Sequence, residues 1–183
     1  LTWKDIDRLN KSTQIPIVLK GVLSKEDVLA AAKLGLGGCL ISNHGGRQLD
    51  FAMPPIEILA QSRKLLRENG IQDKDFKLFI DGGIRRGSDI IKAICLGADA
   101  VGLGRPFLYA MATYGQPGIE RAISILKEEM LRDMKLLGAR RLSDLNEELV
   151  DIESLKFKGI SSSDYLYNSN YTQMPPPPFR KRF

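Results

Sequence analysis

Four short apolar runs divide the first 103 residues of the chain, and a longer mixed segment follows each of the first three. The runs cover residues 15–19, 38–41, 76–80 and 100–103. They carry apolar residues at consecutive positions and do not alternate with polar ones, which is typical of strands buried on both faces of a parallel sheet. We therefore predict four parallel strands.

The segments around these runs are predicted to be helices, because their apolar residues recur every three or four positions. A capping box near the N-terminus starts a short first helix. Ser24 and Ser88 stand at the N-cap positions of two later helices, and Pro55 begins another between them. After the fourth run the pattern indicates a short helix over 106–113 and a long one over 117–138.

Strand–helix units that repeat in one direction place every strand's carboxyl end at the same edge of the sheet. Four units are half of a (β/α)8 barrel, so the fold class we expect is α/β, the C-terminal half of a TIM barrel. An open doubly wound sheet is the alternative, and the absence of a G-x-G-x-x-G motif after the first strand disfavours it. We expect this half-barrel over 1–155 and an extended Tyr/Pro-rich tail over 156–183, because the tail is too polar to bury a core.

Composition excludes several classes of protein. The formal net charge is +5, but Arg180, Lys181 and Arg182 supply three of these charges, and no basic stripe interleaved with aromatic residues points to a nucleic-acid partner. No apolar stretch is long enough to predict a membrane span. Cys39 and Cys95 lie in apolar segments without a C-x-x-C spacing, which predicts two buried thiols.

Two segments rich in glycine and arginine follow the last two predicted strands. The first contains Asp81, Gly82, Gly83, Ile84 and Arg85, and the second contains Gly104 and Arg105. Glycines let backbone N–H groups approach an anion, a helix N-terminus adds partial positive charge, and arginine adds a charged hydrogen bond. One such motif alone would read as a tight turn with solvated arginines. Two in succession, after the last strands of a parallel set, predict a phosphate site.

Candidate catalytic residues follow the first and second strands. His44, the only histidine, lies just past the second strand, and Arg47 follows three residues later. A neutral imidazole accepts a proton near neutral pH, and a guanidinium holds a carboxylate through two parallel hydrogen bonds. Lys20 ends the first strand, where its ammonium group needs a polar partner. Taken singly, His44 would read as an ordinary surface or core histidine and Lys20 as a lysine at the barrel rim.

Taken together, these motifs resemble the FMN-dependent 2-hydroxy-acid oxidising family. The similarity extends from residue 1 to about 138, and it rests above all on the string Ser-Asn-His-Gly-Gly-Arg-Gln at 42–48. Segments 51–58 and 106–137 look most like the fungal cytochrome-linked branch of the family. The resemblance implies a role for each matched residue. His44 would be the base and Arg47, with His44, would bind the substrate. FMN would contact Lys20, Ser42, Asp81, Gly82, Gly83, Ile84, Arg85, Gly104 and Arg105.

The activity that the resemblance implies is FMN-dependent oxidation of an L-2-hydroxy acid, above all L-lactate, with cytochrome c as an electron acceptor. Whether the base removes the α-proton or the hydroxyl proton stays open. An oxygen-using glycolate-type oxidase and an inactive half-barrel that binds only phosphate or a partner subunit are the alternatives. Four earlier βα units of the family barrel have no counterpart here, and haem would belong to a domain upstream. We expect a homo-oligomer in the mitochondrial intermembrane space, with a peroxisomal or cytoplasmic location as alternatives.

Overall fold

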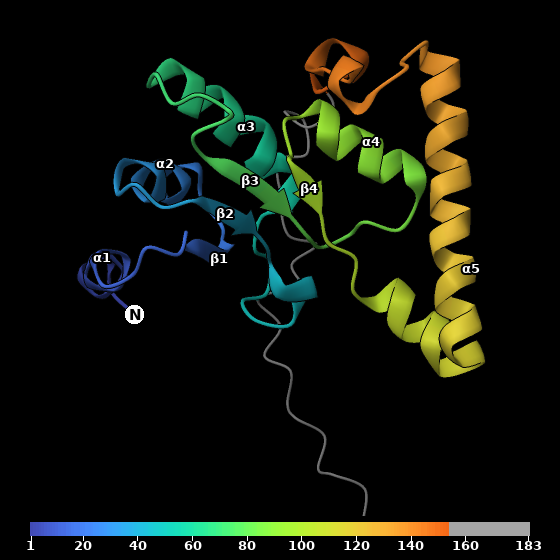
Figure 1. Cartoon of the computed structure of the whole chain (residues 1–183), viewed down its shortest axis with the longest axis horizontal. Helices are drawn as coiled ribbons and strands as arrows, with labels where there is room; N and C mark the ends of the chain where they lie inside the picture. The colour runs from blue at the N-terminus through green and yellow to red at the C-terminus, as the bar shows by residue number, and fades with distance from the viewer. Residues whose placement is uncertain (154–183) are drawn as a thin grey trace, which may run out of the picture. The chain divides into compact units, whose positions relative to one another are not determined.

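The computed structural model describes residues 1–153 of the chain, so the predicted tail over 156–183 lies outside the described residues. The chain divides into two units, Leu1–Asp151 and Ile152–Phe183, and the first contains every helix and strand discussed below. The larger elements, shown in Figure 1, are α1 (Trp3–Lys11), β1 (Val18–Val22), α2 (Lys25–Lys33), β2 (Gly38–Ile41), α3 (Pro55–Glu68), β3 (Lys77–Ile80), α4 (Gly87–Cys95), β4 (Ala100–Val101) and α5 (Arg105–Leu137). Three 3-10 turns complete the described part: His44–Gly46, Leu142–Asp144 and Glu147–Leu149.

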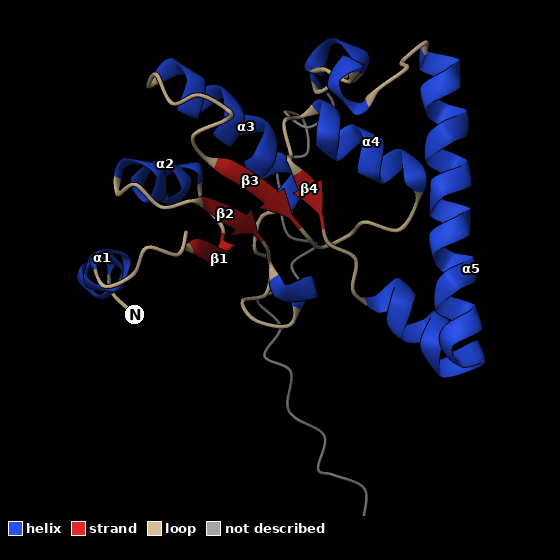
Figure 2. Cartoon of the chain, in the orientation of Figure 1, coloured by secondary structure: helices blue, strands red, loops and turns tan. Residues whose placement is uncertain are grey.

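The four strands form one parallel sheet in the order β1-β2-β3-β4. In Figure 2 the arrows of β2, β3 and β4 point in the same direction, so their carboxyl ends meet at one edge. The prediction of an α/β fold with a parallel sheet is confirmed. Each strand pairs with the next one along the chain, which is the order that successive βα units produce.

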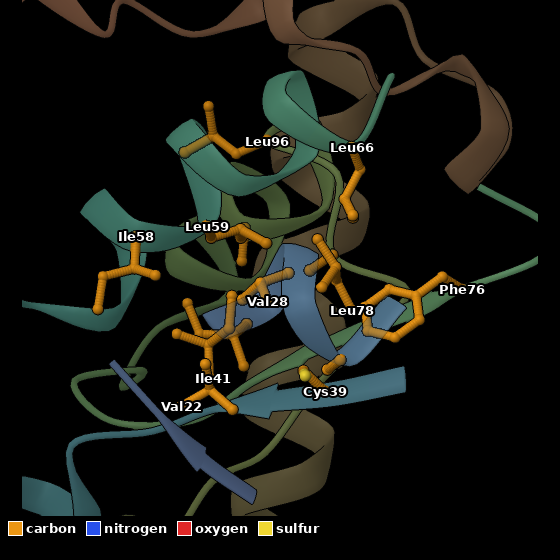
Figure 3. Close-up of a cluster of buried hydrophobic side chains, with 14 of the residues drawn as sticks. Val22, Val28, Cys39, Ile41, Ile58, Leu59, Leu66, Phe76, Leu78 and Leu96 are labelled. Atoms are coloured by element: carbon orange, nitrogen blue, oxygen red, sulfur yellow. The ribbon is translucent and has the colours of Figure 1, made fainter. Parts of the chain in front are cut away.

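One face of the sheet carries the hydrophobic core. Cys39 and Ile41 of β2 and Leu78 of β3 point toward α2 and α3, where they pack with Val28 and Leu59 (Figure 3). All five side chains are fully buried. Burial raises the pKa of the Cys39 thiol to about 12, so this cysteine is a protonated packing residue, as the sequence predicted.

The opposite face of the sheet is much more open. Lys20, Leu40, Phe79 and Ala100 stand opposite one another across the four strands. Leu40 and Phe79 are half-buried, and Lys20 and Ala100 are exposed. Helices α2, α3 and α4 pack on the other face, so within residues 1–153 this face has no helical cover.

The first strand lies three residues later than predicted. Segment 15–19 was expected to be the strand, but β1 covers Val18–Val22 and Ile15 is 75% exposed. Pro16 has no N–H to donate to a ladder, and pairing with β2 begins where the Gly37 N–H meets the Ile17 carbonyl. Lys20 is therefore inside the strand and not at its end.

Smaller corrections concern the later elements. β3 begins at Lys77 and not at residue 76, and β4 ends at Val101 and not at residue 103. Ser88 was expected to cap α4, but the helix starts at Gly87 and Ser88 is its second residue. The Asp89 carboxylate caps this helix instead, accepting the N–H groups of Arg85 and Arg86 at 2.9 Å.

Helix α5 is two helices joined at a kink, as the sequence predicted. Gly115 has φ 62° and ψ −145°, outside the helical region, and Pro117 follows two residues later. Beyond this kink the long part of α5 runs beside α4 (Figure 1), and Ile91, Cys95 and Met134 form a second small core between them. The helix ends at Gly138 in the left-handed conformation.

No helix within residues 1–153 combines the length and the apolar character that a membrane span requires. The same residues hold no cluster of His, Cys, Asp and Glu suited to a metal ion.

A candidate active site at the carboxyl edge of the sheet

Three polar side chains from three strands meet at the carboxyl edge of the sheet. The Lys20 ammonium nitrogen lies 2.8 Å from Asp81 Oδ2 and 3.1 Å from Ser42 Oγ. Ser42 is fully buried, whereas the Lys20 side chain is 48% exposed. The Lys20 ammonium group is thus held by two hydrogen bonds, and its side chain still faces solvent on the open face of the sheet.

The turn after β2 presents His44. Ser42 Oγ accepts the His44 N–H at 3.1 Å, and Asn43 Oδ1 accepts the Gly45 N–H at 3.1 Å. His44 itself has φ 56°, a left-handed conformation that is uncommon for a residue with a side chain. Such backbone strain clusters at functional sites. The imidazole is exposed and forms no hydrogen bond with any residue of 1–153, so its nitrogens stay available to a ligand.

The backbone of β1 makes room for this imidazole. Gly21 sits at the register shift between Lys20 and Val22, with φ 88°. A Cβ at this position would lie 2.7 Å from His44 Cε1, closer than carbon atoms normally approach. Gly21 therefore lets the histidine ring lie directly against the strand that carries Lys20.

The turn after β3 has free backbone donors. Gly82 and Gly83 both have positive φ, 93° and 84°, and in the described part of the chain neither N–H donates a hydrogen bond. The buried side chain of Ile84 anchors the turn in the core. Helix α5 begins nearby at Arg105, after Gly104, without a side-chain cap on its first N–H groups.

The two arginines of this turn have different surroundings. Arg86 forms an ion pair with Glu129 of α5. Arg85 is exposed and its guanidinium forms no ion pair within residues 1–153. Of the two, Arg85 is therefore the one that is free to meet an anion.

Arg105 connects the α5 start to the histidine turn. Its Nη2 donates to the Gly45 carbonyl at 2.9 Å. The structure thus brings Lys20, Ser42, His44 and Arg105 to one edge, in contact directly or through one residue. Arg47 is different: it is exposed and makes no hydrogen bond or ion pair with residues 1–153.

Sequence reasoning missed the residues that support this edge. Asn43 orders the histidine turn, Asp89 caps α4, and Glu129 accepts the Gly87 N–H at 2.8 Å. Asp89 had a usable signal, because it stands three residues after the N-cap, where a capping carboxylate is expected. Glu129 caps a helix that begins 42 residues earlier in the chain, which no local pattern could indicate.

Comparison with known proteins identifies the same family along the whole described region. The family model of FMN-dependent dehydrogenases matches residues 1–152. L-lactate dehydrogenase (cytochrome) of Wickerhamomyces anomalus is 50% identical over 98% of this chain and 31% of its own length. The enzyme of the same name from Saccharomyces cerevisiae is 51% identical over 93% of this chain and 29% of its own length. The chain therefore spans about a third of the length of these relatives.

Solved structures agree. A flavocytochrome b2 mutant with pyruvate bound superposes on the whole chain with a TM-score of 0.84 and 47% identity, and the match covers 47% of that structure. A mandelate oxidase superposes on 79% of the chain with a TM-score of 0.71 and 40% identity, covering 42% of that structure. From the match of its sequence over 152 residues and of its fold over the full length, the chain belongs to the family of FMN-dependent dehydrogenases.

Proposed function

We propose that this chain is the C-terminal half of the barrel of an FMN-dependent L-2-hydroxy-acid dehydrogenase that oxidises L-lactate to pyruvate. The observation that carries the proposal is the meeting of Lys20, Ser42, His44 and Arg105 at the carboxyl edge of one parallel sheet. In (β/α)8 enzymes this edge holds the active site, with phosphate bound after the last two strands.

The open face of the sheet supports the half-barrel. Leu40 and Phe79 are apolar side chains that residues 1–153 leave half-buried, and β1 and β4 each have an unpaired edge. Four further strands would pair with both edges and bury this face as the packed interior of a closed barrel. We propose the barrel half over 1–155 and a separate tail over 156–183.

The residues present fit an FMN molecule. Its phosphate requires N–H donors and positive charge, which the turn at Gly82 and Gly83, the uncapped start of α5, Arg85 and Arg105 provide. Asp81 and Ile84 belong to the segment after β3, and Gly104 belongs to the segment after β4. Its ring system requires a cation near the edge that becomes negative on reduction, and Lys20, held by Ser42 and Asp81, supplies one. When bound, FMN accepts the two electrons that leave the substrate.

The remaining chemistry belongs to His44 and Arg47. Oxidation of a 2-hydroxy acid to a 2-oxo acid releases two electrons and two protons. The imidazole of His44, which has no hydrogen-bond partner within residues 1–153, takes one of these protons from the substrate, and its ring lies against Gly21, the residue after Lys20 in β1. Arg47, three residues on and without a protein partner in residues 1–153, binds the substrate carboxylate through two parallel hydrogen bonds.

Lactate and cytochrome c are the favoured substrate and acceptor. The two relatives named L-lactate dehydrogenase (cytochrome) are 50% and 51% identical to this chain, whereas the peroxisomal (S)-2-hydroxyacid oxidase GLO3 of Arabidopsis thaliana is 39% identical. From the similarity to these two dehydrogenases we also propose that the protein is located in the mitochondrial intermembrane space. Any haem would belong to a domain upstream of this chain.

The test uses the full-length protein that contains this chain, loaded with FMN. We expect lactate to reduce cytochrome c, with oxygen consumption as the parallel measurement. His44→Gln should lower kcat by at least ~100-fold, as loss of a general base does, while FMN absorbance is retained. Arg47→Lys should act mainly on KM for lactate, because an ammonium group cannot form the two-pronged contact.

Two results would change the proposal. Fast oxygen consumption with no cytochrome c reduction would assign the protein to the oxidase class. Lactate turnover near the wild-type rate in His44→Gln would remove the histidine from the mechanism.

A further inference from the structure

The start of α4 is held from α5 by a single carboxylate. Glu129 Oε2 accepts the Gly87 N–H at 2.8 Å, and its Oε1 pairs with the Arg86 guanidinium. The Glu129 side chain is only 13% exposed. The Gly87 N–H holds the pKa of Glu129 below the ordinary glutamate value, with a smaller contribution from Arg86, so this carboxylate is ionised at neutral pH.

Glycine at position 87 allows α4 and α5 to approach each other closely. A Cβ at position 87 would lie 2.6 Å from Glu129 Cβ and 2.6 Å from the Met130 nitrogen, so only glycine fits against α5 here. Such close packing leaves the first turn of α4 little freedom to move relative to α5.

The contact between Glu129 and Gly87 positions the turn that immediately precedes α4. The turn runs from Gly82 to Arg86, and its free N–H groups and Arg85 form half of the proposed phosphate site. The other half, Gly104 and Arg105, is the beginning of α5 itself. Helix α5 therefore carries one half of the phosphate site at its start and holds the other half through Glu129 beyond its kink.

Glu129 also separates the roles of the two adjacent arginines. By pairing with Arg86, it keeps one guanidinium turned toward α5, while Arg85 is exposed and unpaired within residues 1–153. Loss of the carboxylate would release Arg86 and remove the acceptor for the Gly87 N–H at the same time.

We propose that Glu129 is a positioning residue for the cofactor phosphate, acting through Gly87 and Arg86 on the turn at 82–86. This inference rests on the proposed function, because it gives the turn the task of binding FMN. Glu129 does not contact the phosphate; it sets the distance between the two segments that do.

The experiment measures FMN affinity in the full-length protein after removal of FMN, by titration of flavin fluorescence. Glu129→Ala should raise the Kd for FMN by about tenfold or more, as loss of an outer-shell partner does at metal sites, because the turn at 82–86 is then no longer held to α5. Glu129→Gln keeps an oxygen for the Gly87 N–H but loses the charge, so its Kd should lie between those of the wild type and Glu129→Ala. Glu128→Gln is the matched control, since Glu128 is adjacent, 60% exposed and, within residues 1–153, paired only with Arg121 at 3.5 Å. Its Kd should equal that of the wild type.

Thermal unfolding of the FMN-free variants separates positioning from stability. A lower Tm in Glu129→Gln with an unchanged Kd for FMN would overturn the inference, because it would leave Glu129 a purely structural role. If Glu129→Ala does not fold, the Kd for FMN of Glu129→Gln tests the inference by itself. Failure of the wild-type protein to bind FMN is a separate result, and it would overturn the proposed function together with this inference.

Discussion

The two ends of the parallel sheet use ion pairs in opposite ways. At the carboxyl end, Lys20 and Asp81 lie 2.8 Å apart with side chains 48% and 27% exposed. At the amino end, Arg63 and Asp99 also lie 2.8 Å apart, but the Arg63 side chain is only 5% exposed. The distance is the same, so the surroundings decide what each pair does.

At the amino end every N–H donor of the Arg63 guanidinium is used. Besides Asp99, the guanidinium donates to the Gly97 carbonyl through two nitrogens, to the Phe76 carbonyl and to the Asp73 carboxylate. Asp99 in turn accepts the Leu78 N–H and the Lys77 ammonium group. A buried guanidinium with all its partners locks α3 to the loops before β3 and β4, and it leaves nothing for a ligand. In (β/α)8 barrels the amino end of the strands is associated with stability.

The carboxyl end keeps its groups available. Within residues 1–153, the N–H groups of Gly82 and Gly83 and the imidazole of His44 have no hydrogen-bond partner, and His44 has a left-handed backbone. All three features would be costly in a region selected for stability alone. The comparison indicates that this molecule places rigidity at one end of the sheet and binding capacity at the other. Four substitutions in the full-length protein test that division.

The largest effect should come from the amino end. Arg63→Met removes the donor to the Gly97 and Phe76 carbonyls, which typically costs about 1–3 kcal/mol for each buried group left unsatisfied, in addition to the lost ion pair with Asp99. Urea unfolding measures the loss. Arg67→Met is the matched control, because Arg67 pairs with the same Asp73 but is 52% exposed, and it should cost under about 1 kcal/mol. Equal losses in the two variants would erase the distinction between the ends.

Arg105→Met should impair binding at the carboxyl end and leave stability nearly intact. The arginine is exposed and its one side-chain hydrogen bond within residues 1–153 is to the Gly45 carbonyl, so the unfolding free energy of the FMN-free protein should change little. FMN affinity should fall by an amount equivalent to one charged hydrogen bond, about 1.5–3 kcal/mol. Flavin titration measures it, with Arg121→Met on the same helix as the control. An unchanged affinity would contradict the phosphate assignment.

Lys20→Met tests the exposed ion pair directly against the buried one. We expect a change in unfolding free energy below about 1 kcal/mol, since solvent screens a pair of this exposure. Lactate turnover should nevertheless fall, because the reduced flavin loses the cation at its edge. A stability loss comparable to that of Arg63→Met would show that the carboxyl end is as structural as the amino end.

The smallest effect should be a pH dependence at the amino end. The hydrogen bond from Arg67 holds the pKa of Asp73 below the ordinary value of 3.8, with further contributions from Arg63 and Lys77. The stabilisation from the ionised carboxylate is therefore complete above pH 3.8 and is lost as the pH falls toward the lowered pKa. Asp73→Asn should be slightly less stable than the wild type at pH 6, and the difference should shrink near pH 3. A stability difference between Asp73→Asn and the wild type that stays constant from pH 6 to pH 3 would contradict a contribution of the Asp73 carboxylate to the pH dependence.

Local patterns were enough for elements whose signals lie within a few residues. The strand at Gly38–Ile41 was predicted at its observed bounds, and the start of the helix at Pro55 was predicted within one residue. The break between two helices at Gly115–Pro117 was predicted as well. The first strand was predicted wrongly, because its bounds depend on which residues of β2 it pairs with, and an apolar run cannot specify that register.

The residues of the candidate site could also be predicted from local patterns in the sequence. Lys20, His44, Arg47 and Arg105 each follow or end an apolar run, so a repeated strand–helix pattern alone places them at one edge. Their roles as base, substrate clamp and cofactor contacts remain predictions that the proposed experiments address.

The sequence by itself determined the βα order, the parallel sheet and the set of residues brought to its carboxyl edge, because these follow from short-range periodicity and chain direction. Only the tertiary structure decided which groups hold that edge in place. Glu129 meets Gly87 across 42 residues, Arg63 meets Asp99 across 36, and Gly21 admits the His44 ring across the sheet. These contacts depend on how helices and loops pack against one another, and no pattern of neighbouring residues encodes the distance between two side chains so far apart in the chain.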